Sequence, residues 1–181
     1  KKIRAEMRKV AQAGVRWRQV LGADANPQEV ELLARCYTQT YQEHGNAPYL
    51  KAAFFKVQFA QAPQHWLLCI ASHDDYPGQD FACSLIALDP LQKVAYGRYW
   101  GALARVSCLH FDACYYQTLQ WCIAQGYRRF EGGAQGEHKM ARGLLPVVTP
   151  SLHWIAHSQF AQAIERFTER EQLGVAAYIM S

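Results

Sequence analysis

The sequence predicts one α+β (α/β) domain in which helices flank a mixed central sheet. Helix-like and strand-like segments alternate along most of the 181 residues. A helix-like segment also separates a run of consecutive strand-like segments from one further short strand. Half of the residues are hydrophobic, so a chain of this length can bury about 70% of its unfolded surface without a disulfide or a structural metal. Together these observations favour a single compact core.

The N-terminal part of the chain predicts three helices and one strand. The helices cover residues 1–13, 26–44 and 50–60, and the strand covers residues 15–21. Asn26 is a good helix N-cap and Pro27 fits the first helical turn, so these two residues mark the start of the second helix. Pro63 limits the third helix, because its ring cannot continue a helical backbone.

The rest of the chain predicts an antiparallel meander followed by alternating helices and strands. The segments are strands at 65–72, 81–88 and 93–100, a helix at 112–125, a strand at 128–131, a helical turn at 137–142, a strand at 147–156 and a helix at 159–172. Asp-, Pro- and Gly-rich turns at 74–78 and 89–90 join the three consecutive strands. Gly126 closes the helix that follows them.

Positive charge gathers at the start of the chain. Residues 1–18 carry seven basic side chains against Glu6 alone, although the net charge of the whole chain is only +4. Residues 1–13 are interpreted as a basic linker helix with a short apolar stripe, and residues 14–181 as the single domain. Such a helix could bind tRNA or another acidic partner, or it could be a solvated helix face. Because the chain begins in mid-helix pattern without Met, we expect it to continue a missing N-terminal half.

The cysteines and the hydropathy predict a soluble, cytoplasmic protein. The six cysteines show no C-x-x-C pair, so they are interpreted as reduced thiols. Cys114 follows His110 by one helical turn and could be a nucleophile, but it shares a helical face with Cys122, which favours core packing. No apolar run reaches the roughly 18 residues of a membrane span, and the chain does not open like a signal peptide.

The segment Glu131–Gly143 is the strongest candidate for a functional site. It contains four of the twelve glycines together with Glu131, Glu137, His138, Lys139 and Arg142. Clustered glycines are expected where the backbone needs positive φ or approaches a ligand closely. An acid, an imidazole and cations in one turn supply a proton acceptor, a tunable donor and anion-binding groups. The alternative is a solvated loop without a function.

Four segments in order resemble one bacterial family. They are Gly97-Arg-Tyr-Trp-Gly101, Leu109-His-Phe-Asp-Ala-Cys-Tyr-Tyr116, residues 131–143 and Ser151-Leu-His-Trp-Ile-Ala156. Their spacing is similar to that of the FemAB-like predicted N-acyltransferases, or peptidoglycan biosynthesis proteins, which are assigned to the GNAT acyltransferase superfamily. The resemblance extends to about Glu171 and matches the C-terminal half of members that contain two GNAT-like halves. Asp112 departs from the family pattern, where Glu is more usual.

The resemblance implies both the fold and the reaction. In a GNAT-like mixed sheet the strand before the central helix and the strand after it splay apart at the active site, here residues 93–100 and 128–131. The implied function is an acyltransferase that moves an acyl or aminoacyl group onto an amine acceptor in cell-wall precursor modification. The span 101–111 has one glycine and lacks the glycine-rich turn that holds the CoA pyrophosphate. The donor therefore stays open between acyl-CoA and aminoacyl-tRNA, and we expect no tightly bound cofactor.

Roles follow from what acyl transfer requires. Glu137 and His138 are candidate proton acceptors, Glu131 could bind the acceptor amine or pair with Arg98 or Arg142, and one of Tyr115 and Tyr116 could act as a general acid. We assign catalysis to Glu137, His138, Glu131 and Tyr116, and substrate binding to Arg142, Arg98, Tyr99, Trp100, His110 and Lys139. If residues 137–142 are α-helical, His138 and Arg142 share a face. Lys139 would then point elsewhere as a surface charge, and Asp112 is expected to cap the helix that it begins.

Two other functions stay open. A metal-dependent hydrolase could be built from His110, Asp112, Glu131, Glu137 and His138. The two histidines of this set do not have H-x-x-x-H or H-E-x-x-H spacing, so no metal is expected. A catalytically silent GNAT-like binding module is the other alternative, because one fold hosts many functions.

Overall fold

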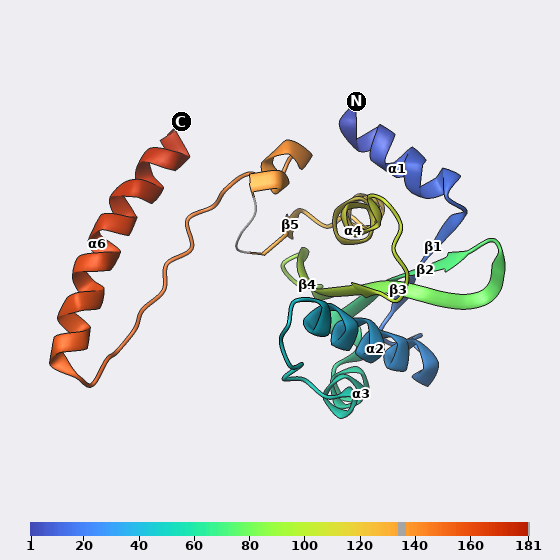
Figure 1. Cartoon of the computed structure of the whole chain (residues 1–181), viewed down its shortest axis with the longest axis horizontal. Coiled ribbons are helices and arrows are strands. Elements are labelled where there is room, and N and C mark those ends of the chain that lie inside the picture. Colours follow the sequence, from blue (N-terminus) through green and yellow to red (C-terminus); the bar gives the residue numbers. More distant parts are fainter. Residues whose placement is uncertain (134–136, 181) are drawn as a thin grey trace. The chain divides into compact units, whose positions relative to one another are not determined.

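A computed structural model describes residues 1–133 and 137–180. The chain forms two compact units, Lys1–Arg142 and Gly143–Ser181. In chain order the elements are α1 (Lys2–Gln12), β1 (Val15–Leu21), α2 (Pro27–Glu43), α3 (Ala52–Gln61), the 3₁₀ turn η1 (Pro63–His65), β2 (Trp66–His73), β3 (Tyr76–Asp89), β4 (Val94–Ala102), α4 (Leu109–Phe111), the π-helical segment η2 (Asp112–Tyr116), α5 (Gln117–Ala124), β5 (Arg129–Glu131), the 3₁₀ helix η3 (Glu137–Arg142) and α6 (Ser158–Met180). Figure 1 shows the first unit as a sheet covered by helices.

The sheet of the first unit has the order β1-β2-β3-β4-β5. β1 to β4 pair antiparallel, which confirms the predicted meander. β5 pairs parallel with β4, from Val94 opposite Arg129 to Tyr96 opposite Glu131. β4 then continues to Ala102 without β5 beside it. The prediction that these two strands are parallel neighbours is therefore confirmed, and so is the mixed α+β fold. Their divergence at the C-terminal ends stays a prediction, because β5 ends at Glu131.

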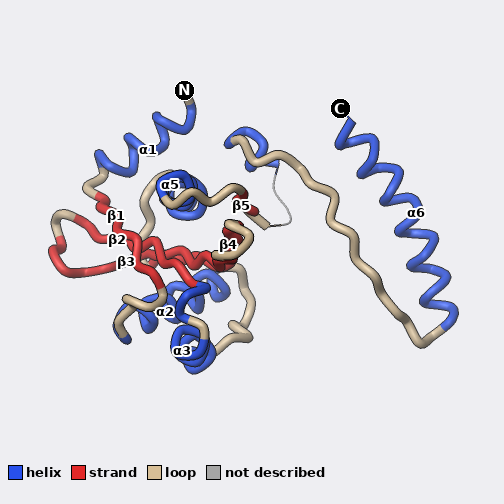
Figure 2. Tube along the Cα trace, turned by 180° about the vertical axis from the view of Figure 1, so that it is seen from behind, coloured by secondary structure: helices blue, strands red, loops and turns tan. Residues whose placement is uncertain are grey.

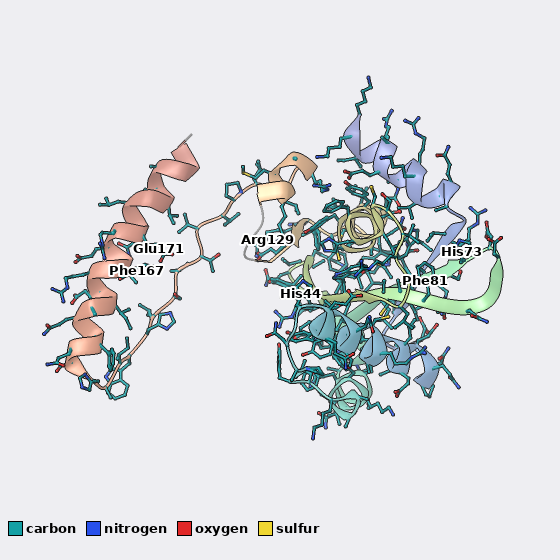
Figure 3. The ribbon with its side chains drawn as sticks, viewed as in Figure 1. His44, His73, Phe81, Arg129, Phe167 and Glu171 are labelled. Atoms are coloured by element: carbon teal, nitrogen blue, oxygen red, sulfur yellow. The ribbon has the colours of Figure 1, made fainter. Side chains whose placement is uncertain are left out.

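Helices α2 and α3 cover one face of the sheet (Figure 2). The Asn26 side chain accepts a hydrogen bond from the Glu29 amide while Glu29 accepts one from the Asn26 amide, so a capping box fixes the start of α2. The packing of α2 on β4 is close because Gly101 has no side chain. A Cβ atom at Gly101 would lie 2.0 Å from the carbonyl oxygen of Cys36. Side chains fill the space between the sheet and these helices (Figure 3).

The other face of the sheet carries the central helix, which consists of α4, η2 and α5 (Figure 2). The Ser84 hydroxyl of β3 donates to the carbonyl of Ala113 at 2.9 Å, which satisfies a backbone acceptor of the π-helical segment. α1 belongs to the same unit, and its Val10 is completely buried against β1, β2 and the start of the central helix. The interpretation of residues 1–13 as a linker to another half stays a prediction.

The predicted strand at 147–156 is wrong. Residues 144–155 have no regular secondary structure, and Val147, Val148, Leu152 and Trp154 are largely exposed. Alternating apolar residues suggest a strand, but a strand needs hydrogen bonds from a neighbour. In the second unit α6 follows this segment and is longer than the predicted helix at 159–172.

Candidate active site

A cavity of ≈ 280 Å³ opens beside β4, beyond the point where its pairing with β5 ends. Its lining combines β3, β4, the central helix, β5 and η3: Ser84, Leu85, Ile86, Gly97, Arg98, Tyr99, Trp100, His110, Cys114, Tyr115, Phe130, Gly132 and Lys139. Most of these side chains are apolar or aromatic, and a few polar groups converge among them. Such a cavity is typical of a site for a small molecule or for part of a larger substrate.

A β-bulge in β4 shapes this cavity. Leu85 of β3 lies opposite Tyr99, but the next residue, Ile86, lies opposite Gly97. Arg98 is therefore the extra residue of the bulge. A bulge bends its strand and leaves the extra residue out of the ladder, so the backbone at Arg98 can be directed toward a ligand.

Five of the predicted substrate-binding residues line the cavity: Arg98, Tyr99, Trp100, His110 and Lys139. The Arg98 guanidinium lies over the Tyr99 ring, 5.7 Å from its centroid. The Trp100 and His110 rings are 4.8 Å apart between centroids. Cation–π and ring contacts of this kind hold the polar groups in place at the cavity.

Lys139 was expected to be a surface charge, and this expectation is wrong. Its Nζ donates to the carbonyl oxygens of Gly132 at 2.6 Å and Gly133 at 3.0 Å. Burial lowers the pKa of the Lys139 ammonium. The reason for the error is the helix type, because residues 137–142 form a 3₁₀ helix in which side chains three apart share a face. Lys139 is thus aligned with Arg142, and the expected α-helical alignment of His138 with Arg142 does not apply.

Arg142 and Tyr116 lie outside the cavity lining and bind a residue of α1. Arg142 is 4% exposed, its Nη2 donates to Glu6 Oε1 at 2.9 Å and its Nε donates to the Tyr116 hydroxyl at 2.9 Å. The Tyr116 hydroxyl donates to Glu6 Oε2. Burial and the hydrogen bond to Glu6 raise the pKa of Tyr116 to about 12. Arg142 also covers the Phe111 ring at 3.5 Å. We call Glu6, Tyr116 and Arg142 the buried network.

Glu131 and Asp112 also differ from what was expected. Glu131 pairs with Arg129 of β5 at 3.2 Å, and among the described side chains it forms no ion pair with Arg98 or Arg142. Asp112 does not cap the helix, which already begins at Leu109. Its buried carboxylate accepts hydrogen bonds from Trp17 at 3.0 Å and Gln117 at 3.1 Å. Burial raises the pKa of Asp112, although these two donors oppose the shift.

Two lining residues of the central helix are additions to the predicted site. Tyr115, rather than Tyr116, lines the cavity, and burial raises the pKa of its hydroxyl. Cys114 lines the cavity as well, but burial raises the pKa of its thiol, so the thiol stays protonated and is a poor nucleophile. The side chains of Glu137 and His138 lie outside the described residues, and their catalytic role stays a prediction. The sequence signal for Tyr115 was its pairing with Tyr116, which left open which hydroxyl faces the cavity.

The described residues also bear on metal and membrane binding. Within them no three His, Cys, Asp or Glu side chains gather as a metal site would require. All six cysteines are described, and all are free thiols. A search of the described helices finds none with both the length and the apolar character needed to span a bilayer.

Comparison with known proteins identifies the family. A family model for FemAB-like proteins, described as peptidoglycan biosynthesis/recognition, matches residues 1–181. This chain belongs to the FemAB-like family. The match covers every segment from which the resemblance was drawn. No curated protein matches the FemAB-like chain significantly.

Solved structures share the fold of this FemAB-like chain. The C-terminal domain of a putative lysylphosphatidylglycerol synthetase from Agrobacterium fabrum has a TM-score of 0.54 and 16% identity over 77% of the chain. A probable acetyltransferase has a TM-score of 0.53 and 12% identity, covering 79% of this chain and 99% of that protein. AAC(6')-Iy, solved with the bisubstrate analogue CoA-S-monomethyl-acetylneamine, has a TM-score of 0.51 and 12% identity over 79% of the chain and 98% of that protein.

These likenesses establish a GNAT-like fold. The chain spans only 43% of the Agrobacterium fabrum structure, so it corresponds to part of that protein. The family is described by peptidoglycan biosynthesis or recognition, and the solved structures add the fold.

Proposed function

We propose that this FemAB-like domain transfers an acyl or aminoacyl group onto an amine acceptor, with the cavity between β4 and β5 as the acyl site. The observation that carries the proposal is the end of the parallel β4–β5 pairing at Tyr96 and Glu131, beyond which β4 continues beside the cavity. The bulge at Arg98 and the central helix complete the cavity walls. Family membership supports a substrate related to peptidoglycan.

The bulge supplies a means of polarising the acyl carbonyl. Acyl transfer develops negative charge on that oxygen, and hydrogen-bond donors fixed in advance stabilise the charge. We assign this role to the backbone N–H at Arg98, because the bulge removes Arg98 from the β3–β4 register. The apolar cavity walls strengthen this hydrogen bond, because they exclude water from it.

Proton transfer requires a base for the amine and an acid for the leaving group. Among the described lining residues, His110 has the imidazole suited to accept a proton, and Tyr115 has a hydroxyl that can donate one. Burial keeps Tyr115 protonated at neutral pH, as a general acid requires. Glu137 and His138 remain candidate bases from the adjoining helix η3. Glu131, exposed at the end of β5, remains a candidate for binding the acceptor amine.

The experiment combines a donor screen with matched variants of the full chain. Acyl-CoA esters and aminoacyl-tRNAs are tested for thermal stabilisation, since a ligand at a hundred times its Kd stabilises the native state by about 2.7 kcal/mol. With an active donor and acceptor, Tyr115→Phe, His110→Gln, Glu137→Gln and His138→Ala are compared for turnover. Loss of the true acid or base should lower kcat by about 10² to 10⁴ while the Tm changes little.

Controls come from residues of the same type outside the cavity. Tyr127→Phe matches Tyr115→Phe, because Tyr127 packs on Trp121 beyond the cavity. His44→Gln matches His110→Gln, because His44 is exposed at the end of α2 (Figure 3). If no donor stabilises the chain and all four site variants behave like the two controls, the proposed function is wrong.

A further inference from the structure

The charged side chains that line the cavity are all cationic within the described part of the chain. They are Arg98 and Lys139, and no described carboxylate joins them in the lining. The nearest acidic residue along β5, Glu131, is paired with Arg129 instead. A cavity that presents charge of one sign selects ligands of the opposite sign and disfavours like charge.

Lys139 is held in a way that leaves a donor for a ligand. Its ammonium group has three N–H donors, and two of them are directed to the carbonyl oxygens of Gly132 and Gly133. Among the described side chains no carboxylate forms an ion pair with Lys139, and burial lowers the pKa of its ammonium. A partly buried cation without a counter-ion is costly in free energy. An anionic ligand would remove that cost.

Arg98 adds a second cation from β4, whereas Lys139 lies on η3. It is the extra residue of the bulge in β4, and the face of Tyr99 supports its guanidinium at 5.7 Å. No described carboxylate forms an ion pair with Arg98. Guanidinium groups bind carboxylates and phosphates through two parallel hydrogen bonds, so this position suits an anion as well.

From these observations we infer that the cavity binds a substrate portion that carries an anionic group, a carboxylate or a phosphate, beside an apolar stem. A substrate portion that carries an ammonium group does not bind in this cavity. The apolar walls contributed by Ile86 and Phe130 contact the stem, while Arg98 and Lys139 bind the anion. This inference rests on the proposed function for the identity of the site, and it narrows the donor. An acyl group without a free amine is accepted, and the α-ammonium of an aminoacyl donor is rejected.

The test measures equilibrium binding of matched small probes to the full chain. The ethylamides of succinate, butyrate and β-alanine have similar stems that end in a carboxylate, a methyl group and an ammonium group, and methyl phosphate tests a phosphate source. Ligand-observed NMR at neutral pH gives each Kd. We expect the succinate amide or methyl phosphate to bind at least tenfold more tightly than the butyrate amide, and the β-alanine amide to bind most weakly. Whichever of the succinate amide and methyl phosphate binds more tightly shows whether the anionic group of the substrate is a carboxylate or a phosphate.

Variants connect the preference to the two cations. Lys139→Gln and Arg98→Gln should each remove most of the anion preference, measured as the ratio of the butyrate amide Kd to the succinate amide Kd. Lys139→Glu should favour the β-alanine amide. Lys56→Gln is the control, because Lys56 pairs with Glu31 on the surface. Arg98 is exposed, so Arg98→Gln tests the inference even if Lys139 variants lose stability. Equal affinity for the three amides, or tightest binding of the β-alanine amide, would overturn the inference.

The two failures can be told apart. Binding without turnover of any acyl donor would contradict the proposed function and keep the charge preference. Turnover with an acyl donor but without any charge preference would support the proposed function and contradict the inferred selection of anionic ligands.

Discussion

Replacing Glu6 by Gln should destabilise the first unit strongly, although Glu6 lies on the N-terminal helix. The Glu6 carboxylate accepts hydrogen bonds from Arg142 and Tyr116, and the Glu6 and Arg142 side chains are only 11% and 2% exposed. Glutamine keeps the shape but removes the negative charge that pairs with the buried Arg142 guanidinium. Removing one partner of a buried ion pair costs about 3–5 kcal/mol. This is a large part of the roughly 5–15 kcal/mol by which a domain is stable.

The measurement is urea unfolding of the full chain, with a surface ion pair as the control. Arg16 and Asp74 are bridged at 2.7 Å, but their side chains are 64% and 45% exposed. Arg16→Gln should therefore cost about 0.2–1 kcal/mol. A double-mutant cycle of Glu6→Gln with Arg142→Met should give a coupling energy above about 1 kcal/mol. If Glu6→Gln costs no more than Arg16→Gln, the buried network does not stabilise the fold and the reasoning is refuted.

Three further predictions concern packing, pH and the N-terminal helix. Gly101→Ala should lower the free energy of unfolding by about 1–3 kcal/mol because its Cβ would meet Cys36 at 2.0 Å, whereas Gly97→Ala, with 3.6 Å to its nearest neighbour, should change little in the same urea assay. Since the pKa of Tyr116 is raised to about 12, the stabilisation that Tyr116 contributes should be complete below about pH 10 and lost as the pH rises through the folded pKa, and Tyr116→Phe should remove this alkaline step from pH-dependent unfolding. Deleting residues 1–13 should lower the Tm because Val10 and Glu6 are buried; a truncated chain with an unchanged Tm would restore the interpretation of a dispensable linker.

The fold could be predicted where the signal is local. The cap at Asn26 and the turn residues between the strands act within a few positions of one another, so the sequence contains the information directly. The strand predicted at 147–156 failed for the opposite reason. Its alternation of apolar residues would let a strand bury one face. No local pattern shows whether another strand is available to pair with it.

The candidate site could be predicted only in part, because contacts between distant residues decide its details. Tyr115 and Tyr116 are adjacent on one helix, and helical periodicity allows only one of them to face a single core. Both are buried because α1 covers the side of the central helix that carries Tyr116. A signal for this was present in Glu6, the single acid within the basic segment, which lies one turn from both Ile3 and Val10 on the apolar stripe. A carboxylate on an apolar face implies a buried cationic partner.

The helix η3 joins the buried network to the charged cavity. Arg142 at its end binds Glu6 of α1, and Lys139 three residues earlier binds the carbonyl groups that follow β5. In a 3₁₀ helix these two positions share one face, so anchoring Arg142 also fixes the direction of Lys139. Loss of the Glu6 carboxylate would therefore free the end of η3 and weaken the hold on Lys139, the cation placed to select an anionic substrate. The basic N-terminal helix, which the sequence suggested as a contact surface for a partner, thus supports the geometry of the site from the opposite side of the central helix.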